Sequence, residues 1–284
     1  MYKAPPSFSI IIPTYQRHKE VCLCLDSLAT YFDSDPRPNH CISLEVIVSD
    51  DARDIQLSVL LEQRYPWCLY IEGPASGPAA NRNHGALHAS LDWLVFTDDD
   101  CLPQPGWIEA FALYSDAYDV MEGRTSPVGV RTRADEECPI NETGGYLWSC
   151  NFAIKRLAFF ELGGFNVDFP AAAMEDVELN LRVNQAGLMR IFVSNALVLH
   201  PWRLRKGRQY ALAHSRSVGK FVSLHPQQAA RFSLVVQLKK AALSLKHNVT
   251  RSVLTRQYKG LMRQIALDFI SHFLTWRAVA KARQ

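Results

Sequence analysis

The first hundred residues alternate short apolar runs with segments of helical spacing, and this alternation restricts the chain to an α/β fold. Four strands rich in β-branched or aromatic residues are expected, at 8–12, 44–48, 68–71 and 93–97. Three helices are expected between them, at 18–32, 55–65 and 79–91. A strand–helix repeat at this spacing predicts a doubly wound, mostly parallel sheet with helices on both faces.

The pattern is less regular beyond residue 100. Further helices are expected at 105–117, 155–162 and 174–185, and two short strands at 190–193 and 196–199. The segment around Glu122-Gly123-Arg124 is expected to be irregular. No internal repeat is present.

Polar motifs follow three of the expected strands at the point where each strand ends. They are Pro13-Thr14-Tyr15, Ser49-Asp50-Asp51 and Thr97-Asp98-Asp99-Asp100. Ligands of doubly wound sheets bind at the carboxyl ends of the strands. Three adjacent aspartates repel one another, so a cation is expected among them, and Mg²⁺ or Mn²⁺ bridging phosphates suits carboxylate oxygens. A solvated acidic turn before Pro103 is the alternative.

Charge divides the chain into two regions. The net charge is +3, but residues 203–284 hold 17 Lys or Arg and a single acid, Asp268. Residues 1–202 hold 14 basic and 27 acidic residues. A split this sharp suggests two regions with different partners, a domain over 1–202 and a basic helical region over 203–284.

The cysteines and the N-terminus indicate a cytoplasmic protein. Seven cysteines lack metal-type spacing, which favours free thiols in a reducing compartment. No signal peptide is recognisable, and no apolar run reaches the roughly 18 residues that span a bilayer.

The basic region contains a segment, 254–281, that is amphipathic on a helical wheel. Its apolar face comprises Tyr258, Met262, Ile265, Phe269, Phe273 and Trp276. Arg and Lys side chains flank this face, which suits a helix lying on an anionic membrane surface. A helix packed on the core is the alternative. Nucleic-acid binding is not expected, because no base-stacking platform accompanies the charge.

Six short motifs together resemble family 2 glycosyltransferases in order and spacing. They are 10–15 (IIIPTY), Asp50-Asp51, 80–85 (ANRNHG), 97–100 (TDDD), Gly163-Gly164-Phe165 and Glu175-Asp176. The resemblance covers about residues 7–202. It implies a GT-A fold, in which a nucleotide-sugar lies across the sheet, and an inverting, metal-dependent hexosyltransferase-like enzyme.

The resemblance assigns roles to individual residues. Asp51 corresponds to the acid that accepts a hydrogen bond from the base, usually uracil; capping of the following helix is its alternative role. Arg82 corresponds to the basic residue that approaches the nucleotide; a solvated helix face is its alternative. Six further residues are assigned to binding of the nucleotide-sugar: Pro13, Thr14, Tyr15, Arg17, Asp98 and Asp99.

The reacting groups are assigned in the same way. Asp100, of the DxD motif, corresponds to the metal ligand for Mn²⁺ or Mg²⁺, and His200 to the histidine that completes the metal site. Asp176 corresponds to the base that removes the proton of the acceptor hydroxyl. Ala52-Arg53 replaces the usual Gly/Asn-Ser, so the resemblance assigns no ribose or phosphate contact to these two residues.

The expected reaction is transfer from a UDP- or dTDP-sugar, with UDP favoured, to a hydroxyl of a glycan or lipid-linked acceptor in polysaccharide biosynthesis. Two alternatives stay open. A nucleotidyltransferase would carry a glycine-rich loop after the first strand, whereas 13–17 (PTYQR) has no glycine. A catalytically inactive carbohydrate-binding protein would have no need of Asp51, Asp98, Asp100 and Asp176 together.

Overall fold

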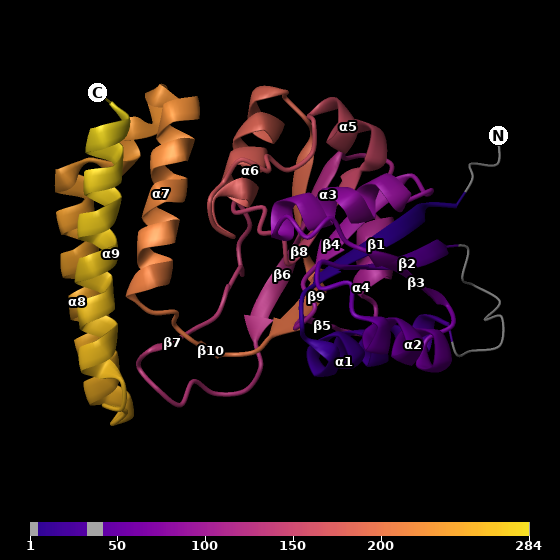
Figure 1. Cartoon of the computed structure of the whole chain (residues 1–284), viewed down its shortest axis with the longest axis horizontal. Helices are drawn as coiled ribbons and strands as arrows, with labels where there is room; N and C mark the ends of the chain where they lie inside the picture. Colours follow the sequence, from indigo (N-terminus) through magenta and orange to yellow (C-terminus); the bar gives the residue numbers. More distant parts are fainter. Residues whose placement is uncertain (1–4, 33–41, 284) are drawn as a thin grey trace. The chain divides into compact units, whose positions relative to one another are not determined.

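The computed structural model describes residues 5–32 and 42–283, and the chain forms two compact units (Figure 1). Unit 1 comprises Met1–Val128, Pro139–Val167 and Glu175–Pro201, and unit 2 comprises Gly129–Cys138, Asp168–Met174 and Trp202–Gln284.

Unit 1 is built on an eight-stranded sheet with the strand order β3-β2-β1-β4-β8-β6-β9-β5. Its strands are β1 (Ser7–Thr14), β2 (Ser43–Asp50), β3 (Cys68–Glu72), β4 (Trp93–Thr97), β5 (Leu102–Pro103), β6 (Val120–Pro127), β8 (Asn151–Lys155) and β9 (Arg190–His200). β1 to β4 are mutually parallel, and β6 is parallel to β9, whereas β8 is antiparallel to both of its neighbours and β5 to β9. The expected doubly wound, mostly parallel sheet is therefore present.

Helices cover both faces of this sheet (Figure 1). One face holds α1 (His18–Leu28), α2 (Ile55–Arg64) and α4 (Trp107–Ala112), and the other holds α3 (Pro78–His88), α5 (Arg156–Glu161) and α6 (Glu175–Gln185). In β1, Ile10 and Ile12 are buried against the first set and Ile11 against the second. A strand covered on both faces is apolar along its length, which explains the unbroken run in β1.

Unit 2 is mainly helical. Its elements are α7 (Arg208–Leu224), a 3₁₀-helix (Pro226–Phe232), α8 (Leu234–Thr255), α9 (Leu261–Ala282) and a two-stranded ribbon of β7 (Glu136–Glu137) and β10 (Arg203–Leu204). α9 packs against both α7 and α8. No helix in the described part of the chain is long and apolar enough to span a bilayer.

Several expected boundaries were wrong. The segment expected to be irregular forms β6, and the two strands expected at 190–193 and 196–199 are one strand, β9, with an irregularity opposite Gly123 and Arg124. The helices expected at 79–91 and 105–117 are shorter, ending at His88 and spanning Trp107–Ala112. The segment expected to be one helix, 254–281, is broken between α8 and α9, where Arg256 and Gly260 have φ of 53° and 80°.

The sheet brings the three polar strand ends together. β1 lies between β2 and β4, and Thr14 at the end of β1 pairs in register with Asp50 at the end of β2. β1 and β4 are parallel, so Thr97 and the aspartates after it lie at the same edge. Six cysteines lie in the described residues and all are free thiols; Cys41 lies outside them.

Candidate active site

The three aspartates after β4 lie at the centre of the edge formed by the strand ends. Two of them are bound by residues at the end of β1 and in the turn after it. The Thr14 hydroxyl donates to Asp99 Oδ2 at 2.8 Å. The Arg17 guanidinium donates to Asp99 Oδ1 and to Asp100 Oδ2, both at 2.7 Å. Burial raises the pKa of Asp99 to about 7, although the charge of Arg17 opposes this. Thr14 and Arg17 therefore bind side chains of the acid cluster in this structure.

Arg82 joins the acid cluster to the start of α6. It projects from α3, is almost fully buried, and donates to Asp98 Oδ1 at 2.6 Å and to Glu175 Oε1 at 3.4 Å. Its guanidinium lies 5.7 Å from the centre of the Phe165 ring. The alternative of a solvated helix face is therefore wrong for Arg82.

Asp176 lies in this same charged cluster, one residue beyond Glu175. It is partly buried, and its Oδ1 accepts the backbone N–H of Val177 at 2.7 Å. Burial and the negative charge of Glu175 raise the pKa of Asp176 to about 7, although the charge of Arg82 opposes this. A carboxyl group that titrates near neutral pH is suited to general base catalysis.

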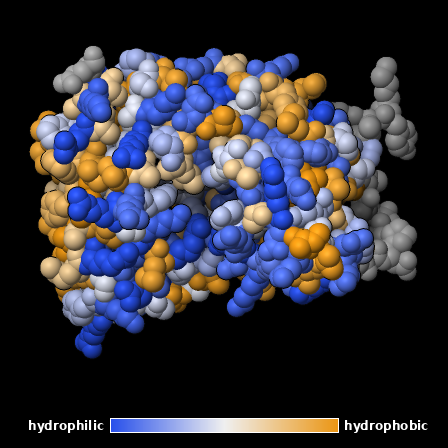
Figure 2. Space-filling model, in the orientation of Figure 1, coloured by the Kyte–Doolittle hydropathy of each residue, from blue (hydrophilic) through white to orange (hydrophobic). Residues whose placement is uncertain are grey.

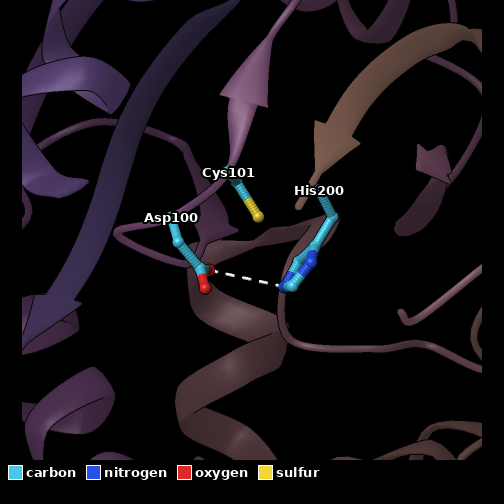
Figure 3. A group of neighbouring side chains, drawn as sticks. All are labelled: Asp100, Cys101 and His200. Atoms are coloured by element: carbon cyan, nitrogen blue, oxygen red, sulfur yellow. Dashed lines mark ion pairs between the residues drawn. The ribbon is translucent and has the colours of Figure 1, made fainter. Parts of the chain in front are cut away.

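Asp100 and His200 approach each other from the ends of β4 and β9 (Figure 3). His200 is fully buried, and its Nε2 lies 3.4 Å from Asp100 Oδ1. The other ring nitrogen, Nδ1, lies 2.8 Å from the carbonyl oxygen of Pro201. A carbonyl only accepts, so Nδ1 carries a proton in this contact, and the ring turns its Nε2 toward Asp100.

This pair of donor atoms fits a divalent cation. A carboxylate oxygen and an imidazole nitrogen whose tautomer is set by a backbone carbonyl are common metal ligands. Cys101 lies with them, and ligand atoms of the three residues are within 4.8 Å of one another (Figure 3). Its thiol donates to the Cys150 carbonyl at 3.8 Å, and burial raises its pKa well above the usual range. A thiol that keeps its proton is a poor metal ligand, so Asp100 and His200 are the better pair.

Asp51 holds the loop that leads into α3. Its Oδ1 accepts the N–H of Ala75 at 3.0 Å, and its Oδ2 accepts that of Gly77 at 2.8 Å. The alternative role as the cap of α2 is wrong, because Asp54 caps that helix through the N–H of Gln56. A carboxylate oxygen can accept more than one hydrogen bond, so these two bonds leave capacity for a ring N–H.

The rest of the turn after β1 is partly exposed. Tyr15 is 57% exposed, so most of its ring is open to solvent. Pro13 is buried in β1 and pairs in register with Ser49. Gln16 has a φ of 54°, which turns the chain between Tyr15 and Arg17.

Glu122 has a structural role that the sequence did not reveal. It is almost fully buried, and its Oε2 accepts the backbone N–H groups of residues 145, 146 and 147 at 2.8, 3.1 and 3.2 Å. Arg190 on β9 pairs with its other oxygen. Glu122 therefore holds the loop after Gly144, but its partners lie more than 20 residues away, so no local pattern indicated the role.

Comparisons with known proteins agree with this geometry. The sequence model of the family described as glycosyl transferase family 2 matches residues 9–158. An uncharacterized glycosyltransferase of Haemophilus influenzae is 35% identical over 92 residues, which is 32% of this chain and 29% of that protein. A pre-mycofactocin glycosyltransferase of Mycobacterium tuberculosis is 27% identical over 176 residues, which is 55% of this chain and 37% of that protein. The matches thus span about a third of each relative's length.

A solved structure shows the fold. The mannosyltransferase PcManGT from Pyrobaculum calidifontis, in complex with GDP-Man and Mn²⁺, is similar with a TM-score of 0.56 at 16% identity. The likeness covers 96% of this chain and 86% of that one, and it confirms the expected GT-A fold. The family's sequence model covers more than half of the chain. This protein therefore belongs to glycosyl transferase family 2.

Proposed function

We propose that this family 2 protein transfers a sugar, with inversion, from a UDP- or dTDP-sugar to a hydroxyl of a glycan or lipid-linked acceptor in polysaccharide biosynthesis. The observation that carries the proposal is the charged cluster centred on Arg82. It brings Asp98, at the end of β4, next to the start of α6, where Asp176 lies. This arrangement supports Asp176 as the base, because the start of α6 lies next to the edge proposed to bind the donor.

The reaction requires one proton acceptor and one departing group. The Asp176 carboxylate removes the proton of the acceptor hydroxyl while that oxygen forms a bond to the anomeric carbon. The bond from this carbon to the phosphate oxygen breaks on the opposite face, and its electron pair leaves with the nucleoside diphosphate. A divalent cation held by Asp100 and His200 would stabilise the negative charge that develops on that diphosphate.

Two further features support a nucleotide-sugar donor. Family 2 membership favours a transferase over a nucleotidyltransferase, and PcManGT, which has this fold, was solved with a nucleotide-sugar and Mn²⁺. The nucleotide there is a guanosine one, so GDP-sugars belong in any test beside the UDP- and dTDP-sugars. Asp51, assigned to the N–H of a pyrimidine ring, is the residue that favours UDP or dTDP.

The test is donor turnover by the full-length protein. We expect release of the nucleoside diphosphate from one of the UDP-, dTDP- or GDP-sugars in Mn²⁺, and loss of this release in excess chelator. An Asp176→Asn variant is the control, because release of the nucleoside diphosphate by a contaminating enzyme would not change with this substitution. Absence of turnover and of binding for all three nucleotide classes would favour the catalytically inactive, carbohydrate-binding alternative.

Unit 2 carries a surface suited to an anionic membrane, and we propose that it attaches the enzyme there. The exposed face of α9 contains Met262, Phe269 and Phe273, which are 78%, 51% and 53% exposed. The sole acid after residue 202, Asp268, is buried and pairs with Arg205. The described surface of 203–283 therefore combines apolar and cationic residues with almost no exposed negative charge, and Figure 2 shows such mixing over α7, α8 and α9. Interfacial helices have this composition.

A further inference from the structure

Unit 2 contains a cavity of about 410 Å³ between its helices. Its buried lining residues are Ala211 and Val218 of α7, Gln237 of α8 and Thr275 of α9. Its rim carries Lys206, just before α7, and Lys240 of α8, both exposed. Interiors of folded proteins are close-packed, so a space of this size between three helices suits a ligand.

The lining of this cavity has an excess of positive charge. Three cationic side chains, Arg205, Lys206 and Lys240, face a single carboxylate, Glu137. Glu137 lies 3.9 Å from Arg205, and Arg205 also pairs with the buried Asp268. Among the described residues, neither Lys206 nor Lys240 forms an ion pair with a carboxylate. Lys206 instead lies 4.6 Å from the centre of the Tyr210 ring. The two lysines therefore line the cavity without a carboxylate partner.

Neutral hydrogen-bonding groups complete the lining. His272 Nδ1 lies 2.8 Å from Gln237 Oε1, and Ser271 accepts a hydrogen bond from Arg205 at 3.1 Å. Burial lowers the pKa of His272, and Lys240 and Arg205 lower it further, whereas Asp268 raises it. Burial and then the charge of Arg205 lower the pKa of His214. Both rings are neutral at neutral pH, so the positive charge of the cavity comes from the lysines and Arg205.

We infer that this cavity binds a phosphate or diphosphate ester, the anionic group of the acceptor. Two ammonium groups at the rim and a guanidinium whose position is held by Asp268 and Ser271 match an anion of two or more charges. A neutral glycan would have no use for uncompensated lysines. Naming the acceptor rests on the proposed glycosyl transfer, whereas binding of the anion itself does not. The phosphate can belong to a lipid-linked or to a soluble acceptor.

Calorimetry of the full-length protein with inorganic pyrophosphate tests the inference. The titration is done in chelator, so that a metal-bound diphosphate at Asp100 and His200 does not contribute. We expect Lys206→Gln and Lys240→Gln each to weaken pyrophosphate binding about tenfold, the usual effect of losing one charged hydrogen bond. Lys239→Gln is the matched control, because Lys239 is equally exposed on α8 but does not line the cavity; we expect it to bind as the parent does.

Vesicles distinguish the two sources of the phosphate. If Lys206→Gln and Lys240→Gln also weaken binding to vesicles that contain phosphatidic acid, relative to Lys239→Gln, the ligand is the headgroup of a lipid. If these variants bind pyrophosphate more weakly but bind the vesicles as Lys239→Gln does, the ligand is a soluble phosphorylated acceptor. Either result supports an anion site. A parent protein that does not bind pyrophosphate, or three variants with equal affinities, would overturn it. Neither measurement requires transfer activity, so failure here is distinct from failure of the proposed reaction.

Discussion

Asp98, Asp99 and Asp100 are adjacent in the chain, yet no two of them have the same set of partners. Asp98 pairs with Arg82, Asp99 with Thr14 and Arg17, and Asp100 with Arg17 and His200. These partners come from β1 and the turn after it, from α3 and from β9. Each carboxylate is consequently held in one direction before any ligand binds. Preorganised groups of this kind stabilise developing charge without reorganising during the reaction.

Replacing Asp100 tests the metal site. We expect Asp100→Ala to abolish turnover and to weaken Mn²⁺ binding, because it removes the carboxylate ligand. Cys101→Ser is the control of similar size at the adjacent position, and it should bind Mn²⁺ as the parent does. Direct titration of Mn²⁺ measures both without reference to activity. Equal Mn²⁺ affinity of Asp100→Ala and the parent would place the ion elsewhere.

Replacing Asp176 tests the base. Asp176→Asn retains the size of the side chain but removes its basicity, so we expect turnover to fall by about 10²–10⁴. Donor affinity should change little. The control is Glu62→Gln, an exposed acid on α2, which should retain parent turnover. A parent-like rate for Asp176→Asn would make Asp176 a helix-start residue only.

The pH profile of kcat/KM gives an independent test of the same residue. The base acts only when it is ionised, and burial with the charge of Glu175 raises the pKa of Asp176 to about 7. We therefore expect kcat/KM to be greatest above about pH 7 and to fall tenfold per pH unit below it. The residual rate of Asp176→Asn should lack this acidic limb. An unchanged limb in the variant would assign it to another group.

At the scale of elements, α3 connects the parts of the site. Asn81 donates to the carbonyl oxygens of Thr14 and Ser49, at the ends of β1 and β2. Asn83 exchanges hydrogen bonds with the backbone of Phe165. Gly85 lies so close to β1 that a Cβ there would be 2.6 Å from Ile11 Cγ2. Together with Arg82, these residues explain the composition of most of the motif at 80–85, since they contact β1, β2, the acids after β4 and the backbone of Phe165.

Replacing Arg82 tests how much this connection contributes to stability. Arg82→Gln leaves Asp98 and Glu175 without their cation, and removing one partner of a buried ion pair costs about 3–5 kcal/mol. The control is Arg64→Gln, since the pair of Arg64 with Asp26 is exposed and should contribute at most about 1 kcal/mol. Urea unfolding measures both. Similar small losses in the two variants would show that the buried pair contributes no net stability.

The loss in Arg82→Gln should also depend on pH. Burial already raises the pKa of Glu175, and Arg82 lowers it. Removing Arg82 raises that pKa further above its value in the unfolded chain. Protonation of Glu175 at acidic pH favours the folded chain, because its pKa is higher there than in the unfolded chain. We therefore expect the loss in free energy of unfolding caused by Arg82→Gln to shrink as the pH falls below the pKa of Glu175 in the folded variant.

At the scale of the whole molecule, charge separates the two regions of the chain, and the membrane proposal follows from that separation. Each basic residue at an anionic surface contributes roughly 1 kcal/mol, and burying a Phe side chain contributes about 1.5–3 kcal/mol. A surface with several of both would attach stably. Salt would weaken this attachment only in part, because apolar burial is not screened.

Flotation with liposomes tests the membrane proposal on the full-length chain. We expect the parent to float with vesicles rich in phosphatidylserine far better than with neutral vesicles. The double variant Phe269→Ser, Phe273→Ser should float much less. The control is Leu113→Ser with Leu157→Ser, two residues of unit 1 that are 79% and 73% exposed. Equal flotation of both double variants would assign the exposed face of α9 to another partner.

The sequence by itself determined strands β1 to β4 and the positions of the motifs along the chain, whereas only the tertiary structure decided which residues each motif contacts. β1 to β4 were predictable because strands buried on both faces are continuous apolar runs, and parallel order places their polar ends at one edge. β6 was missed because Glu122 interrupts its apolar pattern, and β8 because it is only five residues long and begins at a polar residue, Asn151. The hydrogen-bond partners of Glu122 and Asn151 lie far along the chain. The apolar face of the segment 254–281, most of which lies on α9, was also visible in the sequence. That α9 buries Leu267 and Val279 and exposes Phe269 and Phe273 depends on how α7 and α8 pack against it, because a helical wheel gives the angle between side chains and not the direction of a neighbour.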